Sequence, residues 1–247
     1  MTPNLVGKVA AITGASNGIG KATALRLAKE GARVAVGYFS DRSGAAQVVQ
    51  QIGAENAVAI HLDASKIGDI SRFVDETIVR FGKIDLLLPC AGMTGLSPLE
   101  SITEDAFDRL FALNVKGPLF LCQKAAPHMA PGSHIVLFSS TLCAASTVMP
   151  PYLCYVASKG AIEQMTRVLS KDFGRKGIAV NCIAPGPTAT ELFNSIQTEQ
   201  TLAFLRNANP NGRIGEPDDI ADVIAFLCSG DSRWVMGQTL RVNGGMA

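Results

Sequence analysis

A tyrosine and a lysine four residues apart, Tyr155 and Lys159, are the residues of this sequence whose types and spacing most directly suggest chemistry. They precede apolar residues at helical spacing (160–173), and side chains four apart on a helix share a face. A free phenol, with a pKa of about 10, is a poor base at neutral pH, but a neighbouring ammonium favours the phenolate. The pair is suited to passing a proton to or from an alcohol or carbonyl oxygen. The same spacing also arises by chance in many helices.

Two serines end a predicted strand just before this pair. Side chains alternate along a strand, so Ser139 and Ser140 face opposite ways and only one can point into a cleft. A hydroxyl there can donate to a carbonyl oxygen and stabilise the charge that develops during hydride transfer. Serines at strand ends are also common in turns, so Ser140 gains its meaning from Tyr155 and Lys159 on the next helix.

An asparagine, Asn114, lies inside a long segment with helical character, residues 104–129. Its side-chain amide competes with the backbone hydrogen bonds of a helix, which predicts a local kink that holds a water. A functional interpretation uses that water to connect Lys159 with solvent for proton supply. The two interpretations are compatible, and the sequence does not choose between them.

A glycine-rich turn follows the first predicted strand and leads directly into a helix. Glycine permits a tight turn and lets backbone approach a pyrophosphate, and a helix N-terminus attracts that anion. The alternative is a glycine-rich turn without a ligand, but its position between strand and helix favours dinucleotide binding. The spacing is a variant of the usual dinucleotide pattern. The residues expected at the phosphates are Gly14, Ser16, Asn17, Gly18, Ile19 and Gly20.

The end of the second strand bears on the choice of nicotinamide cofactor. An acidic residue there would bind the ribose 2′-hydroxyl and repel a 2′-phosphate. Tyr38 occupies that position, and Ser40 and Arg42 could hydrogen-bond a phosphate. Asp41 is an argument against a phosphate unless it points to solvent. We therefore favour NADP(H) over NAD(H).

Three further strand ends carry residues expected at the cofactor. Asp63 follows the third strand and is placed to hold the adenine edge, or alternatively to cap the next helix. Small residues after the fourth strand would let the cofactor lie against backbone. The turn after the sixth strand would direct backbone and a hydroxyl toward the nicotinamide carboxamide, or is an ordinary Pro-Gly turn. The residues at these last two positions are Ala91, Gly92, Pro185, Gly186 and Thr188.

These residues sit on a chain in which β and α patterns alternate, which predicts a parallel sheet covered by helices on both faces. The fold class expected is α/β, a Rossmann-type doubly wound sheet of about seven strands forming a single domain over residues 1–247. Strands are expected at 9–13, 33–38, 57–62, 84–89, 134–139, 178–183 and 239–242. Helices are expected at 19–29, 43–52, 67–81, 104–129, 155–173, 191–206 and 217–228.

Composition narrows the class of protein. The 247 residues are 47% hydrophobic and carry a formal net charge of +1, which gives no sign of a nucleic-acid face. No apolar run reaches the roughly 18 residues that a membrane helix needs, and residues 1–8 lack the pattern of a signal peptide. Six scattered cysteines, without a metal-ligand spacing, indicate reduced, buried thiols. We expect a cytoplasmic protein without a metal, nucleic-acid partner or membrane partner.

Taken together, these residues resemble the short-chain dehydrogenase/reductase family over essentially the whole chain. The resemblance implies Tyr155 as catalytic acid/base, Ser140 as the group that orients the carbonyl, and Asn114 in a proton relay. It implies that Lys159 lowers the Tyr155 pKa and binds the nicotinamide ribose, and that the protein is a homotetramer or homodimer. The matching motifs are Thr13-Gly14-x3-Gly18-x-Gly20, Asp63, Asn114, Ser140, Tyr155-x3-Lys159, Pro185-Gly186-x-Thr188 and the ending Val242-Asn243-Gly244-Gly245.

Three departures from the family pattern qualify that resemblance. Cys90 stands where the family usually has asparagine, which removes an amide that braces the central strand. Asn17 stands where NADP-preferring members often carry a basic residue. The loop between Ser140 and Tyr155 is longer than usual and apolar, and would line the substrate pocket. This loop and the segment 38–40 resemble those of fungal naphthol reductases and related polyketide ketoreductases.

The function expected from these features is NADPH-dependent reduction of a small-molecule ketone, with a mobile lid over residues 188–209. An alternative is the same machinery operating as an NAD(P)-dependent alcohol or polyol dehydrogenase. A non-enzymatic alternative is a cofactor-binding sensor or assembly subunit, which the intact set of Ser140, Tyr155 and Lys159 disfavours.

Overall fold

A seven-stranded parallel sheet forms the centre of the molecule. The computed structural model describes residues 4–195 and 197–247, and in these residues the strand order is β3-β2-β1-β4-β5-β6-β7, with every neighbouring pair parallel. The strands are β1 (Val9–Thr13), β2 (Arg33–Tyr38), β3 (Ala57–His61), β4 (Leu86–Pro89), β5 (His134–Phe138), β6 (Ala179–Pro185) and β7 (Thr239–Val242).

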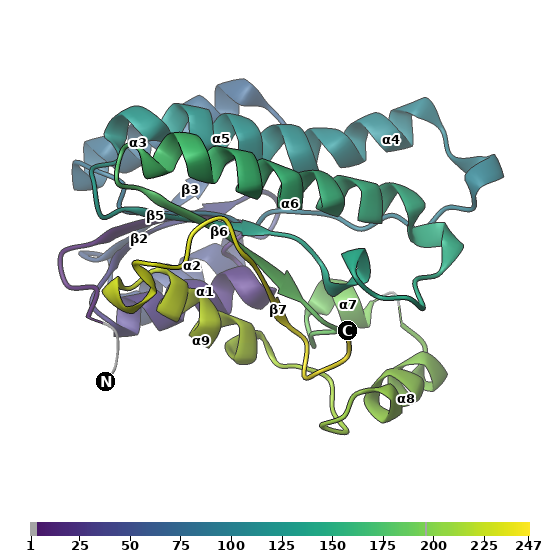
Figure 1. Cartoon of the computed structure of the whole chain (residues 1–247). Helices are drawn as coiled ribbons and strands as arrows, with labels where there is room; N and C mark the ends of the chain where they lie inside the picture. Colours follow the sequence, from purple (N-terminus) through teal and green to yellow (C-terminus); the bar gives the residue numbers. More distant parts are fainter. Residues whose placement is uncertain (1–3, 196) are drawn as a thin grey trace.

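Helices cover both faces of this sheet (Figure 1). One face carries α3 (Ile67–Phe81), α4 (Glu104–Phe111), α5 (Gly117–Ala125) and α6 (Leu153–Gly174). The other face carries α1 (Gly18–Lys29), α2 (Arg42–Ile52) and α9 (Pro217–Leu227). Two further helices, α7 (Glu191–Asn194) and α8 (Glu199–Ala208), lie outside these layers near the C-terminus.

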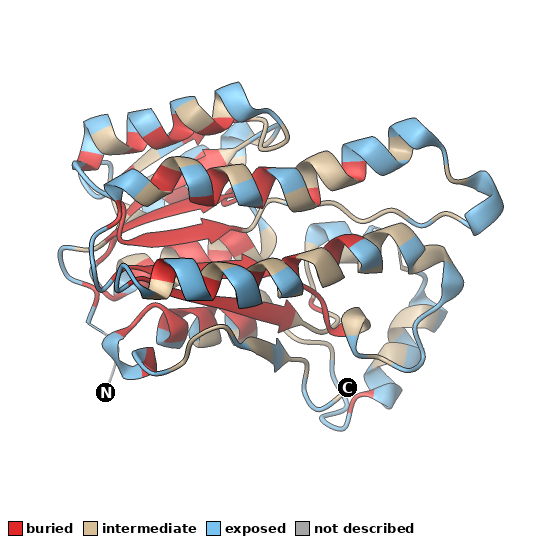
Figure 2. Ribbon diagram, turned by 45° about the horizontal axis from the view of Figure 1, so that its top comes forward, coloured by how far each residue is buried: buried red, intermediate tan, exposed pale blue. Residues whose placement is uncertain are grey.

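Two apolar cores, one on each face, hold the layers together (Figure 2). The strands β1, β4 and β5 are buried along their whole length, which is why they read as continuous apolar runs rather than alternating ones. In the first core Phe73 of α3 packs with Leu87 of β4. In the second core Leu27 of α1 packs with Ile224 of α9. The predicted doubly wound α/β fold is confirmed.

The helix expected over residues 104–129 was wrong as a single element. The helix α4 ends at Phe111, and residues Ala112–Lys116 form a turn of π-helix that contains Asn114, before α5 and a short 3₁₀ turn at Ala126–His128. The helix expected over residues 191–206 is likewise two helices, α7 and α8, and residue 196 lies outside the described residues. Strand limits differ from the expected ones by at most two residues, as ladder hydrogen bonds rather than residue types set them.

The strand order reverses between β1 and β4, and this reversal determines where a ligand can bind. Helices leave adjacent strands in opposite directions there, which opens a crevice beyond the carboxyl ends. Thr13 and Pro89, at the ends of these two strands, are register partners, and the Ala91 N–H donates to Thr13 Oγ1 at 3.1 Å. Across residues 4–195 and 197–247, we find neither a helix suited to crossing a bilayer nor a cluster of three metal-binding side chains.

Candidate active site

Two hydroxyls converge at the carboxyl end of β5. Ser140 directly follows the strand, and its Oγ accepts a hydrogen bond from the Leu142 N–H at 3.3 Å, which fixes the turn Thr141–Cys143. Tyr155 lies in the first turn of α6, and the Ser140 hydroxyl is close enough to lower the pKa of its phenol. The neighbouring Ser139 points elsewhere and donates to Glu163 Oε1 at 2.9 Å. The alternation along the strand therefore places Ser140, as expected, and not Ser139 beside Tyr155.

Lys159 lies one helical turn after Tyr155 and is buried. Its Nζ donates to the Phe138 carbonyl oxygen at 2.9 Å and lies 5.7 Å from the centre of the Tyr155 ring. A Cβ on Gly92 would lie 3.6 Å from Nζ, so the end of β4 passes close to the ammonium. Burial lowers the pKa of Lys159, because a charged ammonium loses its hydration there.

The expected lowering of the Tyr155 pKa is not what the structure shows. Burial raises the pKa of Tyr155 above its ordinary value, and the hydrogen bond from Ser140 opposes this only in part. The physical reason is that the Lys159 ammonium is turned toward the Phe138 carbonyl, while desolvation of the phenol disfavours its charged form. At neutral pH Tyr155 is therefore protonated and holds a proton that it can donate.

Asn114 connects the loop after β4 with α6. Its amide group makes two hydrogen bonds to the backbone of Met93, each 2.9 Å long, and donates a third to Ser158 Oγ at 3.1 Å. Ser158 immediately precedes Lys159, and its Oγ donates to the Tyr155 carbonyl at 2.6 Å. The predicted irregularity at Asn114 is real, but its amide braces Met93 and α6 rather than being directed at Lys159. The water relay remains a prediction.

The glycine-rich turn is built for close approach of backbone. Gly14 and Gly18 have positive φ angles of 64° and 52°, which other residues rarely adopt. A Cβ on Gly20 would lie 2.0 Å from the Gly14 carbonyl oxygen, so helix α1 packs against the turn only because this position is glycine. Asn17 precedes α1 without a capping side chain, and Ser16 is buried beside it. The free N-terminus of α1 fits the pyrophosphate of a dinucleotide, with Ile19 in its first turn.

The end of β2 presents the groups expected at an adenosine ribose. Tyr38 and Phe39 both contact the ring of His61, edge-on at 5.6 Å and stacked at 6.0 Å. Ser40 is exposed, and Arg42, the exposed first residue of α2, makes no ion pair with any residue that the structure describes. Asp41 caps α2 by accepting the Gly44 N–H at 2.8 Å. The acid that argued against a 2′-phosphate is thus engaged with the helix.

Asp63 is occupied by its own turn. Its Oδ1 accepts hydrogen bonds from Ser65 N at 3.0 Å and Ser65 Oγ at 2.6 Å, and its Oδ2 lies 3.4 Å from Lys66 Nζ. Burial opposes ionisation, but these hydrogen bonds outweigh it and lower the pKa of Asp63. The side chain thus shapes the turn before α3, and contact with adenine remains a prediction.

The turn after β6 differs from its expected orientation at one hydroxyl. Pro185 ends the strand and the Gly186 N–H donates to the Val242 carbonyl at 2.9 Å. Thr188 is buried, and its Oγ1 donates to the Gly186 carbonyl at 2.9 Å instead of pointing freely toward the cofactor crevice. Thr190 reaches the glycine-rich turn, where a Cβ on Gly18 would lie 3.2 Å from its methyl group.

Sequence reasoning missed the residues that support this site. Ser158 and Met93 hold Asn114, and the Thr13 hydroxyl braces the backbone of Ala91, the residue after Cys90. Cys90 itself is a partly buried free thiol, and desolvation raises its pKa to about 12. The only sequence feature that pointed to this support was Ser158, the serine directly before Lys159. Met93 acts through its backbone, so its residue type gives no sign of its role.

The raised pKa of Tyr155 gives a direct test in the cofactor-free protein. The absorbance of phenolate at 295 nm is recorded against pH for the wild type and for Tyr155→Phe, and the difference isolates Tyr155 among the three tyrosines. We expect this difference to appear only above the ordinary value of about 10, because burial disfavours the anion. A midpoint below about 9 would mean that Lys159, not burial, dominates.

The sequence is similar to a family model and to proteins of known family. Residues 14–247 match a family model described as "Enoyl-(Acyl carrier protein) reductase". The chain is 37% identical over 254 residues to short-chain dehydrogenase/reductase GME11373 of Pestalotiopsis microspora, covering 98% of this chain and 96% of that one. It is 39% identical over 256 residues to the hydroxynaphthalene reductase-like protein Arp2 of Metarhizium robertsii, with the same coverages of 98% and 96%.

The structure is similar to a solved structure of a ketoreductase. The angucycline C-6 ketoreductase LanV with bound NADP superposes with a TM-score of 0.91 at 35% identity, covering 100% of this chain and 98% of that chain. The similarity extends over the whole sheet and its helices, including the segments that carry Ser140, Tyr155 and Lys159. The chain belongs to the short-chain dehydrogenase/reductase family and is an NAD(P)-dependent oxidoreductase.

Proposed function

We propose that this protein reduces a ketone to a secondary alcohol with NADPH, with Ser140 holding the carbonyl oxygen and Tyr155 donating the proton. The observation that carries the proposal is the pair of neighbouring hydroxyls at the end of β5, one of which has a raised pKa. A protonated phenol beside a second hydroxyl suits an oxygen that gains negative charge as hydride arrives at its carbon. The protonated phenol is the form that reduction requires, because the proton goes from Tyr155 to the oxygen of the ketone.

Glycines and the buried Lys159 border the crevice in which the cofactor would bind. When bound, the nicotinamide supplies the hydride. The turn of Gly14, Gly18 and Gly20 would hold the pyrophosphate, since the N-terminus of α1 presents backbone N–H groups there and no side chain caps it. Gly92 and the buried Lys159 border the place where the nicotinamide ribose would lie, and there the ammonium would exchange the Phe138 carbonyl for ribose hydroxyls. Ala91, Pro185, Gly186 and Thr188 would line the remaining backbone surface.

A preference for NADPH is supported by charge at the end of β2. Arg42 offers an exposed guanidinium, Ser40 an exposed hydroxyl, and Asp41 is turned into the N-terminus of α2. A guanidinium binds phosphate through charge-assisted hydrogen bonds. Only NADPH carries the 2′-phosphate that Arg42 could bind in this way. The structurally similar LanV was solved with NADP bound.

Exposed apolar residues on the loops after β4 and β5 favour a bulky, apolar ketone. Leu96 and Met149 are exposed at 45% and 56%, and the ring of Tyr152 lies 6.3 Å from that of Tyr155. The Ser97 N–H donates to the Pro151 carbonyl at 3.1 Å, so the loops after β4 and β5 form one wall. The names of two similar proteins, a hydroxynaphthalene reductase-like protein and an angucycline ketoreductase, support an aromatic polyketide substrate. Residues 188–209, with Leu192 exposed at 52%, would close over it.

Assembly and location are part of the same proposal. The faces of α4, α5 and α6 expose Phe107, Leu119 and Val168, which fits a homotetramer or homodimer built on these helices. Light scattering of the purified protein measures this directly. In the described part of the chain all six cysteines are unpaired, which fits the reducing cytoplasm, and cell fractionation would test it.

Replacing Tyr155 with phenylalanine is expected to abolish ketone reduction and to leave NADPH binding nearly unchanged, because only the proton donor is lost. The measurement is NADPH oxidation over aromatic ketones, β-keto esters and sugar ketones, together with cofactor titration by fluorescence. An α,β-unsaturated ketone in the panel separates carbonyl reduction from reduction of the double bond, the activity in the family model's description.

Three outcomes would contradict this proposal. Retained turnover in Tyr155→Phe would remove the role of proton donor assigned to Tyr155. Better turnover of alcohols with NAD would favour a dehydrogenase. A wild type that binds NADPH yet turns over nothing would favour a sensor.

Replacing Arg42 with alanine is expected to weaken NADPH binding by about 1.5–3 kcal/mol, or roughly 10- to 150-fold in Kd, with little effect on NADH, because a charged hydrogen bond to the 2′-phosphate is lost. Arg175→Ala, an exposed arginine that follows α6, is the matched control. Dissociation constants for both cofactors come from the same fluorescence titration. Equal losses for NADPH and NADH would overturn the preference for NADPH.

A further inference from the structure

Asn243 joins the C-terminal end of the chain to the segment that carries Ser140. It directly follows β7, and its Nδ2 donates to Thr141 Oγ1 at 2.9 Å and to the Ala247 carbonyl at 3.0 Å. Its Oδ1 accepts the N–H groups of Gly245 and Met246 at 3.0 and 3.3 Å. Both ends of the amide are thus used, and only an asparagine or glutamine side chain can donate and accept in this way.

Thr141 transmits this contact to Ser140. It is the next residue, it is only 4% exposed, and its hydroxyl also donates to the Ala184 carbonyl of β6 at 3.4 Å. The turn after it is closed by hydrogen bonds from Cys143 N to Ser140 O at 3.1 Å and from Ala144 N to Thr141 O at 3.0 Å. The position of the Ser140 hydroxyl therefore depends on a threonine held between β6 and Asn243.

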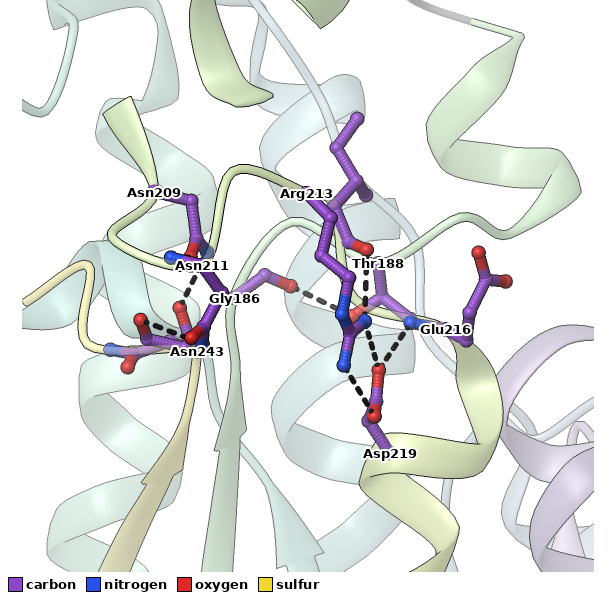
Figure 3. A network of polar contacts seen from close by, with 10 residues as sticks. Gly186, Thr188, Asn209, Asn211, Arg213, Glu216, Asp219 and Asn243 are labelled. Carbon is purple, nitrogen blue, oxygen red and sulfur yellow. Dashed lines mark hydrogen bonds and ion pairs between the residues drawn. The ribbon is translucent and has the colours of Figure 1, made fainter. Parts of the chain in front are cut away.

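The same asparagine contacts the turn after β6, residues 185–188, which we call the cofactor turn, and the end of α8. A Cβ on Gly186 would lie 2.7 Å from that of Asn243, so the turn after β6 rests against it. The Asn243 carbonyl accepts Asn209 Nδ2 at 3.0 Å, and Asn209 ends the segment 188–209. Figure 3 shows Asn209, Asn211 and Asn243 gathered beside Gly186, at a cavity of about 220 Å³.

A second group of residues fixes the other end of that cavity. Arg213 and Asp219 form a two-pronged ion pair with N–O distances of 2.6 and 2.8 Å, and Asp219 also accepts the Glu216 N–H at 2.7 Å. These residues lie apart from the asparagines, near Thr188, whose backbone pairs with Gly215 (Figure 3). They hold the start of α9 and the cofactor turn, and among the described residues none of their hydrogen bonds reaches Thr141. The link to Ser140 therefore runs through Asn243.

We propose that Asn243 and Thr141 are positioning residues for the reduction: together they hold the Ser140 hydroxyl in place against the cofactor turn and the end of α8. This inference rests on the proposed function, because it assigns Ser140 to the substrate oxygen. Misplacing a catalytic group by 1 Å can cost about 100-fold in rate, and a smaller shift is expected here because Ser140 keeps its neighbours on β5.

The test is Thr141→Val, which removes the hydroxyl with little change in shape. We expect kcat for ketone reduction to fall about tenfold while the Kd for NADPH changes less than about twofold. Thr141→Ser restores the hydroxyl and should restore kcat. Thr77→Val is the matched control, because this buried threonine of α3 donates only to Phe73 of its own helix. An unchanged kcat in Thr141→Val, or a loss that serine does not rescue, overturns the proposal.

A second measurement keeps this test separate from that of the proposed function. Hydrogen–deuterium exchange of the peptide spanning residues 139–145 should be faster in Thr141→Val and in Asn243→Ala than in the wild type and Thr77→Val, because the turn after Ser140 loses a support. Unchanged exchange in both variants overturns the link whatever the activity. If the wild type reduces no ketone, the proposed function fails, and the exchange rates alone decide whether Asn243 holds this segment.

Discussion

The burial of the Lys159 ammonium beside Tyr155 is the constraint on which the rest of the site depends. A charged group taken out of water needs compensating polar contacts, and here the Phe138 carbonyl at the end of β5 supplies one at 2.9 Å. Helix α6 must therefore lie against the end of β5, which also brings Ser140 beside Tyr155. Burial lowers the pKa of the lysine and raises that of the phenol, so the enclosure favours the uncharged form of both groups.

The helical segment formed by α4 and α5 is irregular where it supports this arrangement. Within Ala112–Lys116 the chain forms a π turn, and such turns are rare and often found at functional sites. The turn places Asn114 where one amide can bind the backbone of Met93 and the hydroxyl of Ser158. A single side chain thus holds the loop after β4, which borders the crevice, and the first two turns of α6, which carry Tyr155 and Lys159.

Much of this architecture follows from patterns that the sequence displays. The strands are visible because buried parallel strands are continuous apolar runs, and the candidate catalytic residues because Tyr155 and Lys159 fall one helical turn apart after Ser140. A kink at Asn114 was expected, but its form as a π turn was not, since one asparagine signals an irregularity without fixing its geometry. The direction of the Tyr155 pKa was wrong because sequence spacing gives the neighbouring charge but not the depth of burial. The orientation of the Thr188 hydroxyl was also not predicted, because its hydrogen bond to the Gly186 carbonyl depends on the local geometry of the turn, which residue types do not show.

The central claim is that the Ser140 and Tyr155 hydroxyls, with Lys159 behind them, meet the substrate oxygen over the cofactor. A crystal structure of the protein with NADP and the alcohol product tests it most directly. The account predicts the product oxygen within about 2.6–3.2 Å of both hydroxyls, and Lys159 Nζ on the nicotinamide ribose. A nicotinamide bound away from Gly92, or a product oxygen out of reach of Tyr155, would contradict it.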